Sequence, residues 1–222
     1  MVYDYSLAHS PLKEERISKS LVVLVPNSSD YTGATLYTDK NLTISICPPT
    51  EREYPQDIRG VIQHEAGGHG YGKLGDEEII EPTWATTGTL EDIEKKQSWG
   101  WLQNLATTSK MSSVSWANFI FDVRYSDEVD IFEGGAGYMR GVFRPEANSC
   151  MNYGIPYYNV ASRLSIMRRI LEDSGQSFQW IISINMIVKS GEKQLHAQLY
   201  RKVLHMGGAP CIMLLFMSIV SR

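Results

Sequence analysis

Cysteine is scarce in this chain, with three residues among 222: Cys47, Cys150 and Cys211. They form no spaced disulfide framework, and an odd number leaves at least one thiol unpaired. The cysteine content therefore predicts no particular redox compartment.

Long apolar runs and a signal sequence are also missing. The apolar stretch at residues 210–220 is far shorter than the ~20 residues needed to cross a bilayer. We expect it to form a buried terminal strand or a contact surface, and we expect no membrane span. Residues 1–6 lack the charged start and apolar run of a signal peptide.

Positive charge is in short supply, since 21 Lys and Arg face 25 Asp and Glu, for a net charge of −4 at pH 7. With no basic stripe to offset that balance, we expect no nucleic-acid partner. The glycine-rich segment 130–138 lacks the strand-loop-helix pattern with a Lys that binds phosphate. A composition with 43% apolar residues is that of a globular chain with a full core, in one domain or with a second, smaller lobe.

Residues 61–78 contain the candidate metal-binding and catalytic side chains. They hold His64 and His69, with Glu65 directly after the first histidine and an acidic group one short loop later. Neutral imidazole and carboxylate bind Zn²⁺ in a tetrahedral site that keeps one position for water, whose pKa falls toward ~7. A Glu beside a ligand can take the proton from that water and pass it to the leaving amine. The pattern predicts a zinc hydrolase with Glu65 as general base and then acid.

The spacing of the two histidines is unusual. Metalloprotease histidines stand at i and i+4 on one helical face, whereas His64 and His69 stand at i and i+5. On an ideal helix they would lie about 140° apart. A one-residue π-bulge would restore a shared face, and Gly67 and Gly68 in the interval tolerate a distorted backbone. We therefore predict a bulged, zinc-binding helix.

The third ligand is expected just after this helix. Gly72 can turn the backbone so that a later residue returns to the metal. Asp76 is the preferred candidate, with Glu77 and Glu78 as alternatives that otherwise would be ordinary solvated carboxylates.

These motifs resemble the IgA-peptidase family of metallopeptidases, which are relatives of the metzincins. The similarity covers roughly residues 20 to 174. The extra residue between the histidines is similar to the H-E-x-x-x-H variant of dipeptidyl peptidase III, and Glu78 stands where the family often shows Tyr. The matching segments are His64-Glu65 with His69, then Gly72, Leu74, Asp76 and Glu77, followed by 131–135, Tyr138, 141–145 and 148–153.

The resemblance implies an α/β fold of the metzincin-like zincin type. It would comprise a mixed twisted sheet, an active-site helix, a methionine-bearing turn and a C-terminal scaffold helix. Residues 1–175 would form the catalytic domain, and 176–222 an extension of uncertain fold. Met151 would lie beneath the zinc, and Tyr153 would donate to the developing oxyanion, at about 2.7–4 kcal/mol in the transition state. A core methionine and a surface tyrosine are the alternatives for these two residues.

Patterning supplies the remaining elements. A buried central strand is predicted at 21–25, and a half-buried strand at 41–47, where Leu42, Ile44 and Ile46 alternate with mainly polar residues. By resemblance the latter would be the edge strand that pairs with an extended substrate, and a plain solvent-facing edge is the alternative. The other expected elements are helices at 55–72, 90–102, 157–175 and 192–206, the last carrying His196 and His205, and a strand at 180–188.

The leading hypothesis is a zinc-dependent endopeptidase that acts on proteins or peptides. Glycoproteins and immunoglobulins are among the substrates that would fit. By resemblance it would be secreted or held at the cell surface or in the periplasm, with a leader or N-terminal domain upstream. The alternatives are a non-catalytic binding domain on a decayed protease scaffold and a non-haem iron enzyme with the same ligands.

Overall fold

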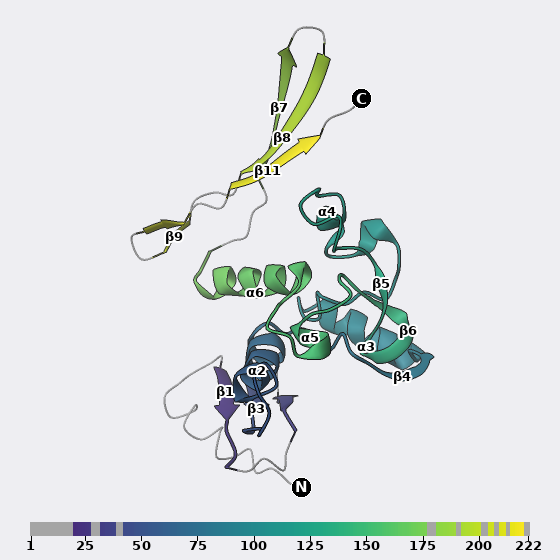
Figure 1. Ribbon diagram of the computed structural model, residues 1–222, viewed down its shortest axis with the longest axis vertical. Coiled ribbons are helices and arrows are strands. Elements are labelled where there is room, and N and C mark those ends of the chain that lie inside the picture. The colour runs from purple at the N-terminus through teal and green to yellow at the C-terminus, as the bar shows by residue number, and fades with distance from the viewer. Residues whose placement is uncertain are drawn as a thin grey trace.

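The computed structural model describes residues 20–27, 32–38, 42–176, 181–189, 192–200, 204–206, 209–211 and 214–219, with side chains up to residue 176. It is a mixed α/β protein, in agreement with the expected α/β class. Figure 1 shows two regions below and beside helix α6, one around β1 and β3 and one around β4, β5 and β6.

The first sheet consists of β1 (Ser20–Leu24), β2 (Ala34–Tyr37) and β3 (Leu42–Ile46) in the order β1-β3-β2. β1 runs parallel to β3, and β2 runs antiparallel to it. The predicted positions of two strands are therefore wrong. β1, expected in the centre, lies at an edge and is exposed from Val23 onward, whereas β3, expected at the edge, is central and fully buried.

The polar face of β3 explains this error. Ser45 Oγ donates to the Glu65 carbonyl over 3.0 Å, and Thr43 Oγ1 accepts a hydrogen bond from Lys73 Nζ. Alternating polar residues in a strand usually indicate a solvent-facing side. Here that side faces the histidine-bearing helix, which satisfies its hydroxyl groups inside the protein.

That helix has two parts, α2 (Ile58–Val61) and the π-helix η1 (Ile62–Tyr71). Asp57 caps α2 by accepting from the backbone N–H groups of Arg59 and Gly60. The predicted π-distortion is confirmed, but it extends over ten residues rather than one.

The second region holds β4 (Ile79–Trp84), α3 (Thr87–Gln97), η2 (Met111–Ser113), α4 (Ala117–Ile120), β5 (Phe132–Gly135) and β6 (Gly137–Arg144). Its sheet has the order β4-β6-β5, with β4 parallel and β5 antiparallel to β6. The helix predicted at 90–102 is present as α3 with earlier limits, because Thr86 caps it by accepting from the N–H of Thr89.

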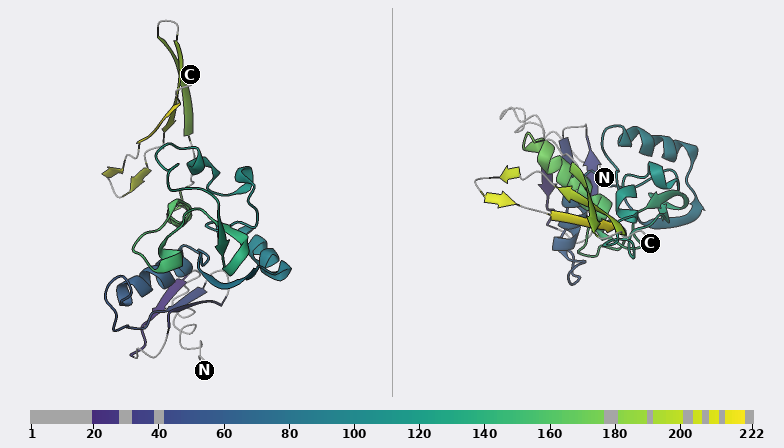
Figure 2. Two further views of the ribbon diagram at one scale, coloured as in Figure 1. Left: turned by 45° about the vertical axis from the view of Figure 1, so that its right-hand side comes forward. Right: turned by 90° about the horizontal axis from the view of Figure 1, so that it is seen from above.

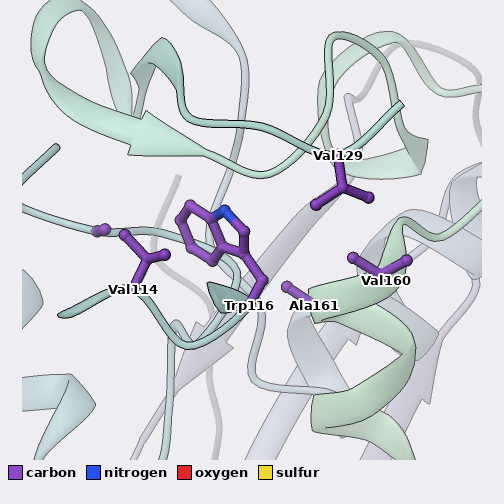
Figure 3. Packing of buried hydrophobic residues seen from close by; sticks show 6 residues of the cluster. Val114, Trp116, Val129, Val160 and Ala161 are labelled. Atoms are coloured by element: carbon purple, nitrogen blue, oxygen red, sulfur yellow. The ribbon is translucent and has the colours of Figure 1, made fainter. Parts of the chain in front are cut away.

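Two helices close this part of the chain. α5 (Cys150–Tyr153) is capped by Ser149, and α6 (Val160–Asp173) by Asn159. The helix predicted at 157–175 is thus confirmed with shorter ends. Figure 3 shows Trp116 packed with Val114, Val129, Val160 and Ala161, so α6 shares a core with the segment before β5.

The C-terminal strands are β7 (Ile181–Lys189), β8 (Glu192–Tyr200), β9 (Leu204–Met206), β10 (Ala209–Cys211) and β11 (Leu214–Ile219). β8 pairs antiparallel with β7 and β11, and these three lie beyond α6 in Figures 1 and 2. The strand predicted at 180–188 is confirmed, and the helix predicted at 192–206 is wrong. Leu195, Ala197 and Leu199 alternate with polar residues, and pairing with β7 selects that two-residue period.

The side chains of His196 and His205 lie outside the described part of the structure. Among the residues that are described, no helix is both long enough and apolar enough to span a bilayer.

Candidate metal centre

Three side chains converge at the end of η1. His64 and His69 project from this helix, and Asp76 projects from the loop that follows it. The two Nε2 atoms lie 3.1 Å apart, and Asp76 Oδ1 lies 3.3 Å from His64 Nε2 and 3.1 Å from His69 Nε2. The three residues form a group that could hold a metal ion.

The π-helix explains why the histidines meet. Its hydrogen bonds run from residue i to residue i+5, as from the Gly72 N–H to the Gly67 carbonyl over 2.9 Å. Residues five apart are therefore neighbours along the helix axis, and His64 and His69 stand in that relation. The unusual sequence spacing and the unusual helix compensate for each other.

Backbone carbonyls fix the tautomer of both imidazoles. His64 Nδ1 lies 2.8 Å from the Cys150 carbonyl oxygen, and His69 Nδ1 lies 2.8 Å from that of Leu74. A carbonyl oxygen can only accept, so each Nδ1 carries the proton and each Nε2 of a neutral ring presents its lone pair. Two facing lone pairs repel unless a cation lies between them. The centre is therefore arranged to bind positive charge.

The electrostatics of the metal-free centre agree with this arrangement. Burial alone would lower the pKa of His64, but the hydrogen bonds to Asp76 and to Cys150 outweigh it and raise that pKa to about 11. Burial likewise would raise the pKa of Asp76, and the hydrogen bonds from His64 and His69 lower it instead. A positive charge at this position is therefore stabilised by Asp76 and by the Cys150 carbonyl.

Glu65 lies beside the centre and is held by the edge strand. Its Oε2 accepts a hydrogen bond from Thr35 Oγ1 over 2.8 Å, and the residue is only 8% exposed. Its side chain lies over Gly33, where an added Cβ would come within 2.7 Å of Oε1. β2 thus fixes the position of the predicted general base.

Met151 also packs against this helix. It is fully buried, and its Sδ lies where a Cβ at Gly68 would stand, so only glycine permits this approach. The structure places the predicted methionine against the histidine-bearing helix. The glycine pair serves close packing as well as the helical distortion.

Of the three acidic candidates for the third ligand, Asp76 is the one that faces the histidines. Glu77 is completely buried and accepts hydrogen bonds from the side chains of Ser149 (2.6 Å), Asn104 (2.8 Å) and Asn159 (2.7 and 2.9 Å). Burial raises its pKa, and these donors act in the opposite direction. Glu78 is exposed and lines the neighbouring hollow.

Glu77 connects two of the metal-binding residues. It directly follows Asp76, its N–H donates to the Met151 carbonyl over 2.7 Å, and its carboxylate holds Ser149. Ser149 in turn precedes Cys150, the residue whose carbonyl orients His64. Sequence reasoning missed this role, because the asparagines that satisfy Glu77 lie 27 and 82 residues away.

Tyr153 does not join the centre in this structure. Its side chain is 66% exposed at the end of α5, and in the described part of the chain it has no hydrogen bond to the three metal-binding residues. Gly154, the next residue, lines one of the hollows beside the centre. The role of Tyr153 as an oxyanion donor stays a prediction.

Two hollows adjoin the centre and share Gly33, His64 and Glu65 in their lining, and the smaller one also includes His69 and Asp76. One, of about 530 Å³, extends toward Arg52, Gln56 and Gly154. The other, of about 420 Å³, extends along β2 to Tyr37 and includes Glu78, Lys96 and Leu102. The centre therefore opens into both hollows.

Comparison with known proteins adds no assignment. No model of a known protein family matches the chain, and no curated protein matches it. The resemblance to the IgA-peptidase family therefore stays a prediction from motifs.

Metal affinity should fall as the pH is lowered. The raised pKa of His64 means that a metal ion must displace a proton near neutrality, so we expect about a tenfold loss of affinity per pH unit for each displaced proton. Competition with a chromophoric chelator between about pH 6 and about pH 8 measures this slope. An affinity that is flat across that range would contradict the arrangement.

Replacing Glu77 by Gln should weaken metal binding. The amide would direct an N–H group at side chains that are themselves donors, which should displace the ligand loop and reduce affinity about 10- to 100-fold. Glu91→Gln, which changes an exposed carboxylate on α3, is the matched control. Equal metal affinity in both variants, measured by calorimetry, would remove Glu77 from the support of the centre.

Proposed function

We propose that this chain is a zinc-dependent endopeptidase. The observation that carries the proposal is the geometry of two imidazoles. Their Nε2 atoms face one another and the carboxylate of Asp76, and backbone carbonyls accept hydrogen bonds from both Nδ1 atoms. Tetrahedral Zn²⁺ at about 2.0–2.1 Å from each ligand would separate the ligand atoms by about 3.3 Å. The observed separations of 3.1, 3.1 and 3.3 Å fit that value.

Zinc held by His64, His69 and Asp76 would act as a Lewis acid and lower the pKa of the attacking water. Glu65 would receive the proton of that water. Thr35 occupies Oε2, and in the described part of the chain no group donates to Oε1. The same carboxylate would then return the proton to the leaving amine, which is general base followed by general acid catalysis.

The groove supports a peptide substrate. β2 is an edge strand, and among the described strands its outer side has no partner. An extended peptide can add to such an edge through main-chain hydrogen bonds, without demands on its sequence. This assigns to β2 the substrate-pairing role expected for residues 41–47. The two hollows that share Gly33, His64 and Glu65 leave room for substrate residues beyond the cleaved bond, which favours cleavage inside a chain over removal of a terminal residue.

The resemblance to the IgA-peptidase family extends this proposal. A metzincin-like catalytic domain would use η1 as its active-site helix, the Met151 turn as its floor and α6 as its scaffold helix. It would act outside the cytoplasm, as a secreted, cell-surface or periplasmic enzyme. Glycoproteins, with immunoglobulins among them, are substrates of this class.

Metal content and cleavage together test the proposal. We expect one zinc per chain by elemental analysis, lost in both His64→Ala and Asp76→Ala. Glu65→Gln should keep the zinc and lose cleavage of unfolded protein by at least about 10²-fold. Iron in place of zinc would favour an oxygenase. Undiminished cleavage by Glu65→Gln would remove this residue from the mechanism, and bound zinc without cleavage would favour a binding domain.

Thr35→Val should lower kcat more than it raises KM. The variant removes the hydrogen bond that positions the Glu65 carboxylate, but it does not block the groove. The loss of one hydrogen bond to a charged group corresponds to about 1.5–3 kcal/mol, or about a 10- to 100-fold lower kcat. Thr35→Ser keeps the hydroxyl and should restore most of the rate. Failure of Ser to restore it would mean that Thr35 acts through packing alone.

A further inference from the structure

The hollow on the Tyr37 side of the centre carries an acidic group that the proposed chemistry does not use. Glu78 lines this hollow and is exposed. Its carbonyl accepts from the Gly137 N–H over 3.0 Å, which fixes its backbone at the start of β4. In the described part of the chain its carboxylate has neither an ion pair nor a hydrogen bond. The carboxylate is therefore available to a ligand.

The cations near Glu78 are engaged elsewhere. Lys96 lines the same hollow, but its Nζ lies 2.7 Å from Asp92 on the same helix. Lys73 is buried and does not line the hollow, and its Nζ donates to Thr43 and lies 4.9 Å from the ring centre of Tyr37. Glu78 thus adds an uncompensated negative charge to this hollow, beside the carboxylate of Glu65 that lines both hollows.

The hollow on the other side differs in charge. Glu51 and Arg52, adjacent and of opposite sign, both line it and are both exposed. A charged side chain would meet one attractive and one repulsive group there. Selection by charge is therefore expected in the Tyr37-side hollow and not in its counterpart.

The direction of the substrate follows from β2. Antiparallel pairing is somewhat more stable per residue than parallel pairing, so an added peptide should run against β2. β2 runs from Ala34 to Tyr37, and the hollow with Glu78 includes its Tyr37 end. The residues that precede the cleaved bond would then lie in that hollow.

We infer that this hollow selects a lysine or arginine side chain on the amino-terminal side of the cleaved bond, with Glu78 as the specificity-determining residue. This inference rests on the proposed function, since it names the substrate class of the same groove. An exposed ion pair of this kind contributes modestly, so the expected preference is about two- to fivefold and should shrink as salt is added.

Matched peptides that carry Lys, Gln or Glu immediately before the cleaved bond test the inference, with the bond located by mass spectrometry. The zinc-loaded parent protein should show the Lys-to-Gln ratio of kcat/KM given above. That ratio should approach one in Glu78→Gln, and Glu78→Lys should prefer the Glu peptide. The control Glu81→Gln changes an exposed carboxylate that lines neither hollow, and it should keep the parental ratio.

The outcomes separate this inference from the proposed function. Three outcomes would overturn the inference and leave the proposed peptidase function intact. They are cleavage without preference for Lys, a preference for Lys that is unchanged in Glu78→Gln, and a preference for Lys only after the cleaved bond. Absence of cleavage of every peptide would overturn the proposed function. Fluorescence anisotropy with the labelled peptides and zinc-loaded Glu65→Gln would then still test Glu78, because equal affinity for the Lys and Gln peptides overturns its role.

Discussion

The i to i+5 hydrogen bonding of η1 is the constraint on which the centre depends. With ordinary α-helical bonding, His64 and His69 would diverge by about 140°. π-Helical residues make up well under 1% of residues in globular proteins, so a ten-residue run needs support from its surroundings. β3 supplies part of it through Ser45, and Met151 supplies another part by packing against Gly68.

The centre has a second requirement, which is that the metal-binding side chains, although they come from separate segments, hold a fixed arrangement. The buried carboxylate of Glu77 meets it by linking the loop of Asp76 to the turn of Ser149. The carbonyl after Ser149 then orients His64, while Leu74 orients His69. Desolvating Glu77 is costly, and the hydrogen bonds from three side chains compensate for it. Displacing one partner should therefore affect the whole centre.

Sequence patterning succeeded where the signal was local. The helix that became α6 and the π-distortion between the histidines both follow from short-range rules. It failed for β3, because its alternating polar residues face a helix that the pattern does not reveal. It failed again for β8, because a short stretch of sequence can fit both a helical period and the two-residue period of a strand. Hairpin pairing with β7 selects the strand.

The sequence by itself determined the chemistry of the candidate centre: two histidines, a neighbouring glutamate and an acidic loop within reach of one another. Only the tertiary structure decided which carboxylate faces the histidines, which strand forms the edge of the groove and which hydroxyl holds Glu65. Contacts between residues that are close in sequence can be predicted from their spacing, because the covalent chain limits their separation in space. Asn104, Ser149 and Asn159 meet Glu77 only through packing of distant segments, so no spacing predicts their contacts.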